Sequence, residues 1–532
     1  MKYPYKFYTH VLIPCIFTFL NITSKAFPQE PLQSSVYEYY RVLELVPGSL
    51  RKSLNIYSLS FNEWDTRKTS NDHPWGHRLA DLYSSQKEEG FDFLPLFQYY
   101  SFNSKYPRGF NDGAAWQGKG INGQWSGGFR FKTGGFFATI NPFIWYSQNL
   151  AFPLVPSVQH SPYGSYIPNI DLPQRFGDTT IFEIDWGESE IRYDYESFTL
   201  GFGNQSFWIG PTFFNSIILS NNAGGFPKID LGIRKTYTTY GDIEFLLFLG
   251  MLESSDYVAS VIRNKNRYIS GYSFSYAPAF IPGFTFGFHR VAFFYSDSWA
   301  TLDFLNAFFP MGKYMGEDQL DQRASITVDW LFPEIGLNVY AEWARNDFSS
   351  SLRLIMRELQ HSQAYTLGLR HRILQTSTSI VMYRLEITEL MHTIDYQTEV
   401  TLGRGTAGFY THHIIQQGHT HKGQLLGATI GPGADSQYLG VSWYSTFGKI
   451  EGYLLRRSLN KDYIYGQPDN VRYHSIVNLS VEVTAGINLD LIINPKVILS
   501  SGVAVSWMIA WNYTGLNDVF NTQFNIGSRL RL

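Results

Sequence analysis

The sequence predicts an all-β protein whose strands form a closed antiparallel barrel across a membrane. Aromatic residues make up 17 % of the chain and charged residues only 16 %, a composition that suits neither a disordered chain nor an ordinary soluble enzyme. Several long segments alternate between apolar and polar residues, which is the period of a strand. Beyond the first residues, no apolar run is long enough to cross a bilayer as a helix, so a membrane protein of this sequence would have to cross with strands.

The first 26 residues have the pattern of a secretory signal peptide. Two lysines precede an apolar run from Val11 to Leu20, and Ser24-Lys25-Ala26 fits a small-x-small cleavage site. A membrane anchor is the alternative, but the run is short against the ~20 residues of a spanning helix. Cys15, the only cysteine, lies inside this segment, so the mature chain is expected to contain no disulfide.

Residues 27–105 are expected to form a small helical subdomain on the periplasmic side. Ser35-Val36-Tyr37-Glu38 has the form of a capping box, and apolar residues then recur at helical spacing until Pro47-Gly48. A second helix is expected over His77–Gln86. The subdomain is either an ordinary periplasmic cap or a plug beneath a pore, and the plug is the sharper hypothesis.

Residues 106–532 carry the alternating segments and are expected to form the barrel. The segment VNLSVEVTAGINLDL, from Val477 to Leu491, has only apolar residues on one face and only polar residues or glycine on the other. The same division recurs over Leu337–Ala344, Val381–Thr388 and Val503–Tyr513. Alternation alone also fits a soluble β-sandwich. Segments of nine or more residues, aromatic residues towards their ends and the amphipathic final segment NTQFNIGSRLRL favour a membrane barrel.

Four motifs stand out along the chain. They are NDGAAWQGKGINGQWSGGFRF from Asn111, VYAEWARNDF from Val339 with QHSQAYTLGLRH from Gln360, THHIIQQGHTHKGQLLGATIGPG from Thr411, and WIGP from Trp208 followed by SNNA from Ser220 and GFP from Gly225. Together they resemble the Wzi family of capsule assembly proteins, from about Val36 to the C-terminus. The resemblance implies an outer-membrane barrel of about 18 strands with a periplasmic helical bundle, acting as a lectin for capsular polysaccharide. Loop lengths differ from those of the best-known members, so the sugar they recognise does not carry over.

The segment IILSNNAGGFP, from Ile217 to Pro227, interrupts the strand pattern. Pro227 lacks a donor and the glycines permit positive φ, so the segment is expected to leave the sheet and to fold inwards or over the rim. It is either a tight turn whose asparagines cap backbone groups or part of a sugar path, in which amides bond hydroxyls and rings stack on sugar faces. The candidate polysaccharide-binding residues are Trp208, Asn221, Asn222 and Phe226.

Two further clusters favour structural roles over chemistry. The first cluster is a group of four histidines within ten residues: His412, His413, His419 and His421. No cysteine or carboxylate lies among them, so we expect lumenal or loop histidines and not a metal site. The carboxylates alternate with apolar residues, as on an inward strand face, although paired acids can in principle cut a glycosidic bond. They are Glu183, Asp185, Glu188 and Glu190. Motifs of serine hydrolases, phosphate loops and zinc proteases are absent from the sequence.

The sequence therefore predicts an outer-membrane, lectin-like barrel that anchors capsular polysaccharide, with no catalytic residue, metal or cofactor. Its expected partners are capsular or other surface polysaccharide and outer-membrane lipid, and we expect a monomer. Nucleic acid is not an expected partner, because the formal net charge is −3 and no basic cluster is evident. Two alternatives remain: a porin or transporter, and an outer-membrane enzyme that modifies lipid or glycan.

Overall fold

The computed structural model describes residues 35–48, 51–57, 73–76, 89–264, 266–295, 320–346, 356, 362–391, 408–465, 475–494 and 496–531. The expected signal peptide (residues 1–26) and the expected helix over His77–Gln86 lie outside these residues. Within the described ranges, no helix is long and apolar enough to span a membrane.

The helices are short and the strands are numerous. The helices are α1 (Ser35–Leu43), α3 (Ser260–Arg263), α7 (Lys461–Tyr465) and α9 (Ser475–Asn478), with 3-10 turns η3 (Pro333–Ile335) and η4 (Trp511–Tyr513). The strands are β1 (Gly90–Phe93), β2 (Leu96–Asn103), β3 (Gly120–Ser126), β4 (Phe129–Thr133), β5 (Phe136–Ile140), β6 (Phe143–Ser147), β7 (Ile181–Asp185), β8 (Glu190–Tyr195), β9 (Phe198–Gly203), β10 (Lys228–Thr238), β11 (Gly241–Leu252), β12 (Arg267–Pro278), β13 (Phe284–Tyr295), β14 (Asp321–Phe332), β15 (Leu337–Asn346), β16 (Gln363–Gln375), β17 (Ser379–Glu389), β18 (Thr420–His421), β19 (Gln424–Leu425), β20 (Asp435–Ser445), β21 (Gly448–Ser458), β22 (Val481–Asn494), β23 (Val497–Ile509) and β24 (Val519–Leu530).

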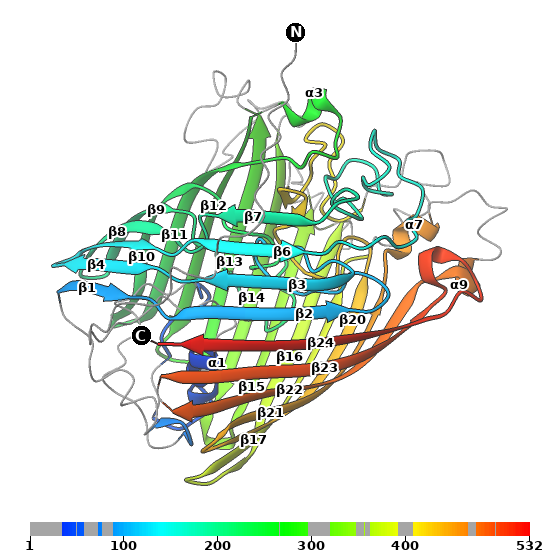
Figure 1. The fold of residues 1–532 in the computed structure, drawn as a ribbon. Coiled ribbons are helices and arrows are strands. Elements are labelled where there is room, and N and C mark those ends of the chain that lie inside the picture. The colour runs from blue at the N-terminus through cyan, green and yellow to red at the C-terminus, as the bar shows by residue number, and fades with distance from the viewer. Residues whose placement is uncertain are drawn as a thin grey trace, which may run out of the picture.

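One antiparallel sheet contains 22 strands, and the short strands β18 and β19 pair with each other. The all-β, antiparallel prediction is confirmed, whereas the expected count of about 18 differs from the observed 22. Strand β24 pairs with β2, from Leu96 opposite Leu530 to Asn103 opposite Gln523. The N-terminal and C-terminal strands therefore lie side by side in one strongly curved wall (Figure 1).

Short breaks within the N-terminal part of the sheet explain the higher strand count. Pro95 separates β1 from β2 and Pro142 separates β5 from β6, and proline cannot donate to a ladder. Between β3 and β4, the backbone at Gly128 passes so close to Ile140 that a Cβ there would overlap the Ile140 carbonyl oxygen. Residues 186–189 divide β7 from β8. Both halves of a broken strand keep neighbouring partners, since β2 pairs with β3 and β1 pairs with β4.

The sheet carries its apolar residues outside and its polar residues inside. In β22, Ile487 is 55 % exposed, whereas the side chain of Glu482 is buried. The same division holds in β17, where Arg384 and Glu386 are buried and Ile387 is exposed. A soluble sandwich would bury the apolar face instead. The predicted outward orientation is confirmed for the members of these apolar sets that lie in strands, whereas Trp511 and Tyr513 of the set from Val503 lie in η4, after the end of β23.

The strand predicted from Val477 begins later than expected. Residues Ser475–Asn478 form α9, and β22 starts at Val481. Asn478 Oδ1 accepts the Gly515 N–H at 2.9 Å, and Ser480 Oγ donates to the Ala510 carbonyl at 2.6 Å. Side chains of this kind offer the backbone an alternative to the ladder, so the alternation of apolar residues runs past the true strand end.

The structure contains the predicted N-terminal helix as α1, which lies within the curve of the sheet (Figure 1). Its apolar residues pack against wall residues that adjoin the short turns between strands. These wall residues are Leu331, Ile380, Tyr444, Ile492 and Ile498. The expected division at residue 105 is not the edge of the sheet, however, because β1 and β2 precede it. The helical part of residues 27–105 thus ends before Gly90 within the described chain.

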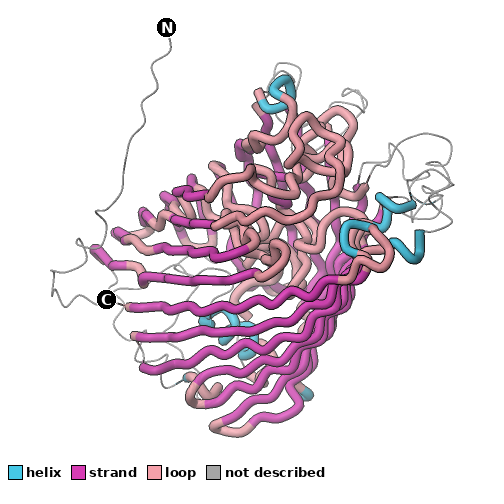
Figure 2. Tube along the Cα trace, turned by 45° about the vertical axis from the view of Figure 1, so that its right-hand side comes forward, coloured by secondary structure: helices cyan, strands magenta, loops and turns pink. Residues whose placement is uncertain are grey.

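Long loops fill the opposite half of the interior. The main apolar cluster joins Ile217, Ile218 and Leu219 of the β9–β10 loop to residues between Phe409 and Ala434 and to inner-face residues such as Phe248 and Phe293. Figure 2 shows these loops gathered within and above one end of the sheet, while short turns join the strands at the other end. The interior is therefore packed at the long-loop end by chain segments that are far apart in sequence.

Candidate functional site

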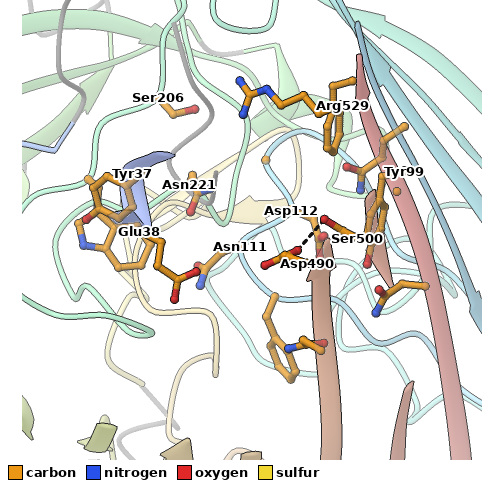
Figure 3. Close-up of a pocket in the computed structure, with 18 of the residues that line it drawn as sticks. Tyr37, Glu38, Tyr99, Asn111, Asp112, Ser206, Asn221, Asp490, Ser500 and Arg529 are labelled. Atoms are coloured by element: carbon orange, nitrogen blue, oxygen red, sulfur yellow. Dashed lines mark hydrogen bonds between the residues drawn. The ribbon is translucent and has the colours of Figure 1, made fainter. Parts of the chain in front are cut away.

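A chamber of about 490 Å³ lies inside the sheet between α1 and the packed loops (Figure 3). Its lining comes from inward faces of β2, β3 and β20 to β24, from α1, and from the β2–β3 and β9–β10 loops. Cavities of this size commonly bind small ligands when a few polar groups are placed among apolar and aromatic ones. The chamber therefore is the candidate site.

Two carboxylates of the wall hold the β9–β10 loop inside the sheet. Glu386 of β17 accepts the backbone N–H groups of Phe214 and Asn215 at 3.1 and 2.8 Å. Glu342 of β15 accepts the Ile217 N–H at 3.0 Å. These hydrogen bonds give partners to backbone N–H groups that are buried away from water, so buried acids in the strands fix a loop that forms one side of the chamber.

The segment from Ile217 to Pro227 folds inwards, which is one of the two courses expected for it. Its Ser220 N–H and Oγ donate to the carbonyls of Leu426 and Gly427, each at 2.7 Å. Gly225 fits closely under the chain, because an added Cβ would overlap the Asn204 carbonyl oxygen. The glycine is therefore needed for a close backbone approach.

The four candidate residues of this region separate into two pairs. Trp208 and Asn221 line the chamber. Asn222 instead donates to the Leu425 carbonyl at 3.1 Å and accepts from Thr429 Oγ1 at 2.6 Å. Phe226 is buried against Phe248, outside the chamber lining. The structure thus brings two of the predicted residues to the cavity and places the other two in the packing behind it.

Several lining residues were not singled out from the sequence. They are Tyr37, Glu38, Tyr99, Asn111, Asp112, Asp490, Ser500 and Arg529 (Figure 3). Asn111 and Asp112 belong to a motif that the sequence analysis quoted, and Asp490 and Ser500 are inward residues of adjacent strands. Their polarity at inward positions is a signal in the sequence, but nothing in it indicates which strands face the same cavity.

Asp112 is the acidic group of the β2–β3 loop at this chamber. Burial raises its pKa to about 6, against the opposing effect of hydrogen bonds such as that from Gln117. Gln117 Nε2 donates to Asp112 Oδ1 at 3.2 Å. The carboxyl group therefore changes charge in a mildly acidic range.

Glu38 joins α1 to the wall of the chamber. Its Oε1 accepts from Tyr444 Oη at 2.7 Å and from Arg384 Nη2 at 2.5 Å, and its Oε2 accepts from Lys449 Nζ at 2.7 Å. Burial by itself raises the pKa of Glu38, but Lys449 and Arg384 together hold that pKa well below its usual range. The helix is thus docked through an ionised carboxylate.

Three of the four histidines are buried and used for packing, whereas His413 is exposed. His419 stacks on Tyr410 and its Nε2 lies 2.8 Å from the Ile218 carbonyl. His421 Nδ1 accepts the Glu253 N–H at 3.1 Å, and His412 Nδ1 accepts the Ile415 N–H at 3.0 Å. In the part of the chain that the structure describes, no group of three His, Cys, Asp or Glu residues could hold a metal ion.

The carboxylates between Glu183 and Glu190 have separate partners. Asp185 pairs with Lys422 at 3.0 Å, Glu188 accepts the Ser206 N–H at 2.9 Å, and Glu190 pairs with Arg192 at 2.8 Å. Glu183 is exposed, but it lies on the same face of β7 as the buried Asp185, opposite Phe182 and Ile184. These acids are distributed among structural contacts along the broken strand β7–β8.

Comparison with known proteins gives the family. A family model for the capsule assembly protein Wzi matches residues 87–494. The chain belongs to the Wzi family. Wzi of Escherichia coli, an outer-membrane protein involved in group 1 capsule assembly and described as a carbohydrate-binding β-barrel, has a similar fold, with a TM-score of 0.62 and 12 % identity over 93 % of this chain and 98 % of that chain. OprD of Pseudomonas aeruginosa matches with a TM-score of 0.40 and 10 % identity, over 84 % of this chain and 94 % of that chain. No curated protein matches the chain.

Membership of the Wzi family confirms the resemblance found in the sequence and the assignment to capsule assembly. It also places this Wzi-family chain in the bacterial outer membrane. The outward apolar face of the sheet agrees with that location, because lipid-facing residues of outer-membrane barrels are apolar.

Proposed function

We propose that this Wzi-family protein binds capsular polysaccharide and anchors it to the cell at the outer membrane, without catalysing a reaction. The chamber carries the proposal, since it places amides, carboxylates and arginines beside aromatic rings. Sugars present hydroxyl groups and apolar C–H faces, which such groups can bind. The carbohydrate binding described for E. coli Wzi supports the same function here.

The sheet is proposed to close into a barrel of 18 strands. Counting each of the four broken strands as one reduces 22 to 18, and β24 pairs with β2 at the point of closure. Closure leaves no exposed edge in lipid, where an unpaired backbone group costs several kcal/mol. The outer face would contact outer-membrane lipid, and the barrel is proposed to be a monomer.

The N-terminal helical part is proposed to plug the periplasmic mouth. Outer-membrane barrels have short turns on the periplasmic side, and α1 packs next to those turns. Trp75 Nε1 donates to the carbonyls of Ser445 and Gly448, which flank the β20–β21 turn, at 3.0 and 3.3 Å. These contacts attach α1 and Trp75 to the short-turn end of the sheet.

Of the four residues predicted as a glycan site, Trp208 and Asn221 are proposed to contact the sugar. Asn222 and Phe226 are proposed to support them, since both pack behind the lining. The carbohydrate site is thus proposed to include the edge of the β9–β10 loop and to extend across the chamber to the inward faces of the sheet.

Deletion of the gene tests the function directly. Cell-bound and shed polysaccharide are measured in the deletion strain and in the strain that carries the gene on a plasmid. We expect the bound fraction to fall and the shed fraction to rise while total synthesis stays constant. A large, steady conductance of the purified protein in planar bilayers would indicate a porin, and turnover of labelled lipid or capsule would indicate an enzyme.

A further inference from the structure

A groove lies on the outward side of strands β20 to β23, apart from the chamber, and has a volume of about 420 Å³. At its centre, Gly452 of β21 has no side chain, and a Cβ added there would meet no atom within 4 Å. Ala485, on the adjacent strand β22, adds only a methyl group. The walls of the groove are apolar side chains: Leu439, Val441, Leu454, Ile487, Val503 and Val505. The groove is therefore a hollow in the apolar wall that an extended hydrocarbon chain can fill.

Arg456 lies at the end of this groove that is nearer to the long loops. It is the next outward residue of β21 after Leu454, which lines the groove. It is opposite Val483 of β22, whose side chain is exposed on the outer face. Opposed residues of an antiparallel pair point to the same face of the sheet, so Arg456 also points outwards.

The height of Arg456 in the wall corresponds to the outer margin of the membrane. At the short-turn end of the same two strands, Trp443 and Phe447 pack with ring centroids 5.4 Å apart, as aromatic residues do at a membrane–water interface. At ~3.4 Å per residue and a tilt of ~40°, a strand rises about 23 Å from position 447 to position 456. The apolar band of such barrels is ~25 Å tall, so Arg456 lies where the acyl chains of the outer leaflet meet their headgroups.

The protein fixes the Arg456 side chain but uses only part of its guanidinium group. Arg456 Nη1 donates to Asp435 Oδ1 at 2.6 Å and to Gln437 Oε1 at 2.8 Å. The Arg456 side chain remains 41 % exposed, whereas that of Asp435 is only 4 % exposed and also binds Lys461 and Ser458. The carboxylate thus lies buried behind the guanidinium. The described residues supply no acceptor for Nε and Nη2 of Arg456, which are left for a ligand.

An exposed arginine at the end of an apolar groove suits a lipid with a phosphate headgroup. A guanidinium group binds phosphate through paired N–H donors, and an acyl chain fills the groove below it. The location selects the source of the lipid, because the long-loop end of the wall meets the outer leaflet, which in a bacterial outer membrane is built of phosphorylated glycolipid. A second copy of the chain fits poorly, since a two-fold interface places the same patch against itself and two hollows would face each other.

We propose that the groove and Arg456 form a binding site for a phosphorylated glycolipid of the outer leaflet, with one acyl chain over Gly452 and a phosphate group at Arg456. This site goes beyond polysaccharide binding, and it rests on the proposed barrel only for its orientation in the membrane. A lipid held there ties the barrel to the leaflet that faces the capsule.

The headgroup contact is tested on the purified, folded protein in detergent by native mass spectrometry. The probes are lipid A with two phosphate groups and the same lipid with both phosphates removed. Arg456→Gln should weaken binding of the phosphorylated lipid about tenfold and leave binding of the other unchanged. Arg263→Gln is the matched control, because Arg263 of α3 is 42 % exposed and also pairs with one aspartate, Asp256, at 2.9 Å. It should change neither affinity.

The acyl-chain contact is tested by filling the groove. Gly452→Leu should weaken binding of both lipids roughly tenfold, because the leucine side chain takes the place of part of the acyl chain. Ala485→Leu fills the groove from the adjacent strand and should have the same effect. Ala341→Leu, on the outward face of β15 two residues after the exposed Val339, should not. The change in gel mobility on heating checks that each variant is folded.

Three results would contradict the site. Equal affinity of the natural protein and Arg456→Gln for the phosphorylated lipid would overturn the headgroup contact. Unchanged binding by both filled variants, each of them folded, would exclude the groove. A dimer of the natural protein that dissociates on Gly452→Leu would show that a second copy occupies the hollow in place of lipid. These measurements involve lipid alone, so their failure leaves polysaccharide binding untouched, and the gene deletion tests that function separately.

Discussion

Lys449 Nζ donates to Glu38 Oε2 at 2.7 Å, and this ion pair joins the N-terminal helix α1 to strand β21. Lys449 also lies 3.2 Å from Glu451 of the same strand. A buried pair is costly to break from one side, because the partner charge is left without compensation. The docking of α1 therefore depends on Glu38 staying ionised.

Glu38→Gln should loosen the plug. Losing one partner of a buried ion pair costs up to about 3–5 kcal/mol, and the glutamine keeps only part of the hydrogen bonding. We expect single-channel conductance in planar bilayers to rise above that of the natural protein. Glu334→Gln changes an exposed carboxylate of the η3 turn and serves as the control. Equal conductance of all three proteins would show that α1 does not depend on this contact or does not seal the pore.

The same contact predicts how the plug responds to acid. Lys449 and Arg384 hold the pKa of Glu38 well below its ordinary value. The stabilisation that these ion pairs give to the docked helix is therefore present above the pKa of an unfolded glutamate. It is lost as pH falls through the lower pKa of the folded state. The seal should hold at a pH at which ordinary carboxylates already become protonated, and should open only in stronger acid. Conductance recorded over an acid titration checks this, with Glu38→Gln expected to lack the acid-dependent step.

The lipid-facing wall predicts a contrast between two exposed apolar residues. Ile487→Arg in β22 should destabilise the barrel by about 2–4 kcal/mol if it lies near the bilayer midplane. Val477→Arg lies in α9, outside the sheet, and should cost much less, although both positions belong to one alternating set in the sequence. Urea unfolding of the protein in lipid vesicles measures both. Equal losses would contradict the placement of the strand boundary.

Asn221→Ala and Asn222→Ala should have different effects. Asn221 lines the chamber, so its loss should release polysaccharide while the free energy of unfolding changes by only about a few tenths of a kcal/mol. Asn222 donates to the Leu425 carbonyl and accepts from the Thr429 hydroxyl. Each of these hydrogen bonds, when lost, should lower the free energy of unfolding by about 0.5–1.5 kcal/mol. Shed polysaccharide and unfolding midpoints measured on both variants distinguish them. Avidity along a long polymer reduces the effect of one weakened contact, so capsule retention is compared at low expression.

Asp112→Asn should remove a pH dependence of stability. The pKa of Asp112 is raised from 3.8 to about 6 by burial, so the folded state holds its proton more tightly than the unfolded state does. Stability should therefore fall as pH rises between those two values and stay lower above them. The asparagine variant should be more stable than the natural protein at pH 7 by roughly 1–3 kcal/mol, since a tenfold change in proton affinity corresponds to ~1.4 kcal/mol. Identical unfolding profiles from pH 4 to pH 7 would contradict the burial of a titrating carboxyl group here.

Local patterns predicted the walls of this protein well. The alternation over Val381–Thr388 determined which residues face outwards, because side chains of a strand point to opposite faces in turn. The same rule failed beyond the strand, at Val477, because the residues around Ser480 bond to a neighbouring turn instead of a neighbouring strand. Capping chemistry predicted α1 at Ser35–Leu43, since its hydrogen bonds are formed within a few residues.

The sequence by itself determined the fold class, the inverted polarity of the wall, the N-terminal helix and the departure of the segment from Ile217 to Pro227 from the sheet. Only the tertiary structure decided that Asn111 and Asn221 face one chamber while Asn222 and Phe226 pack behind it, and that Glu38 binds Lys449 across 411 positions of the chain. The physical reason is distance along the chain: alternation, proline and glycine act on neighbours, whereas a cavity is made where curvature of the sheet brings distant inward side chains together.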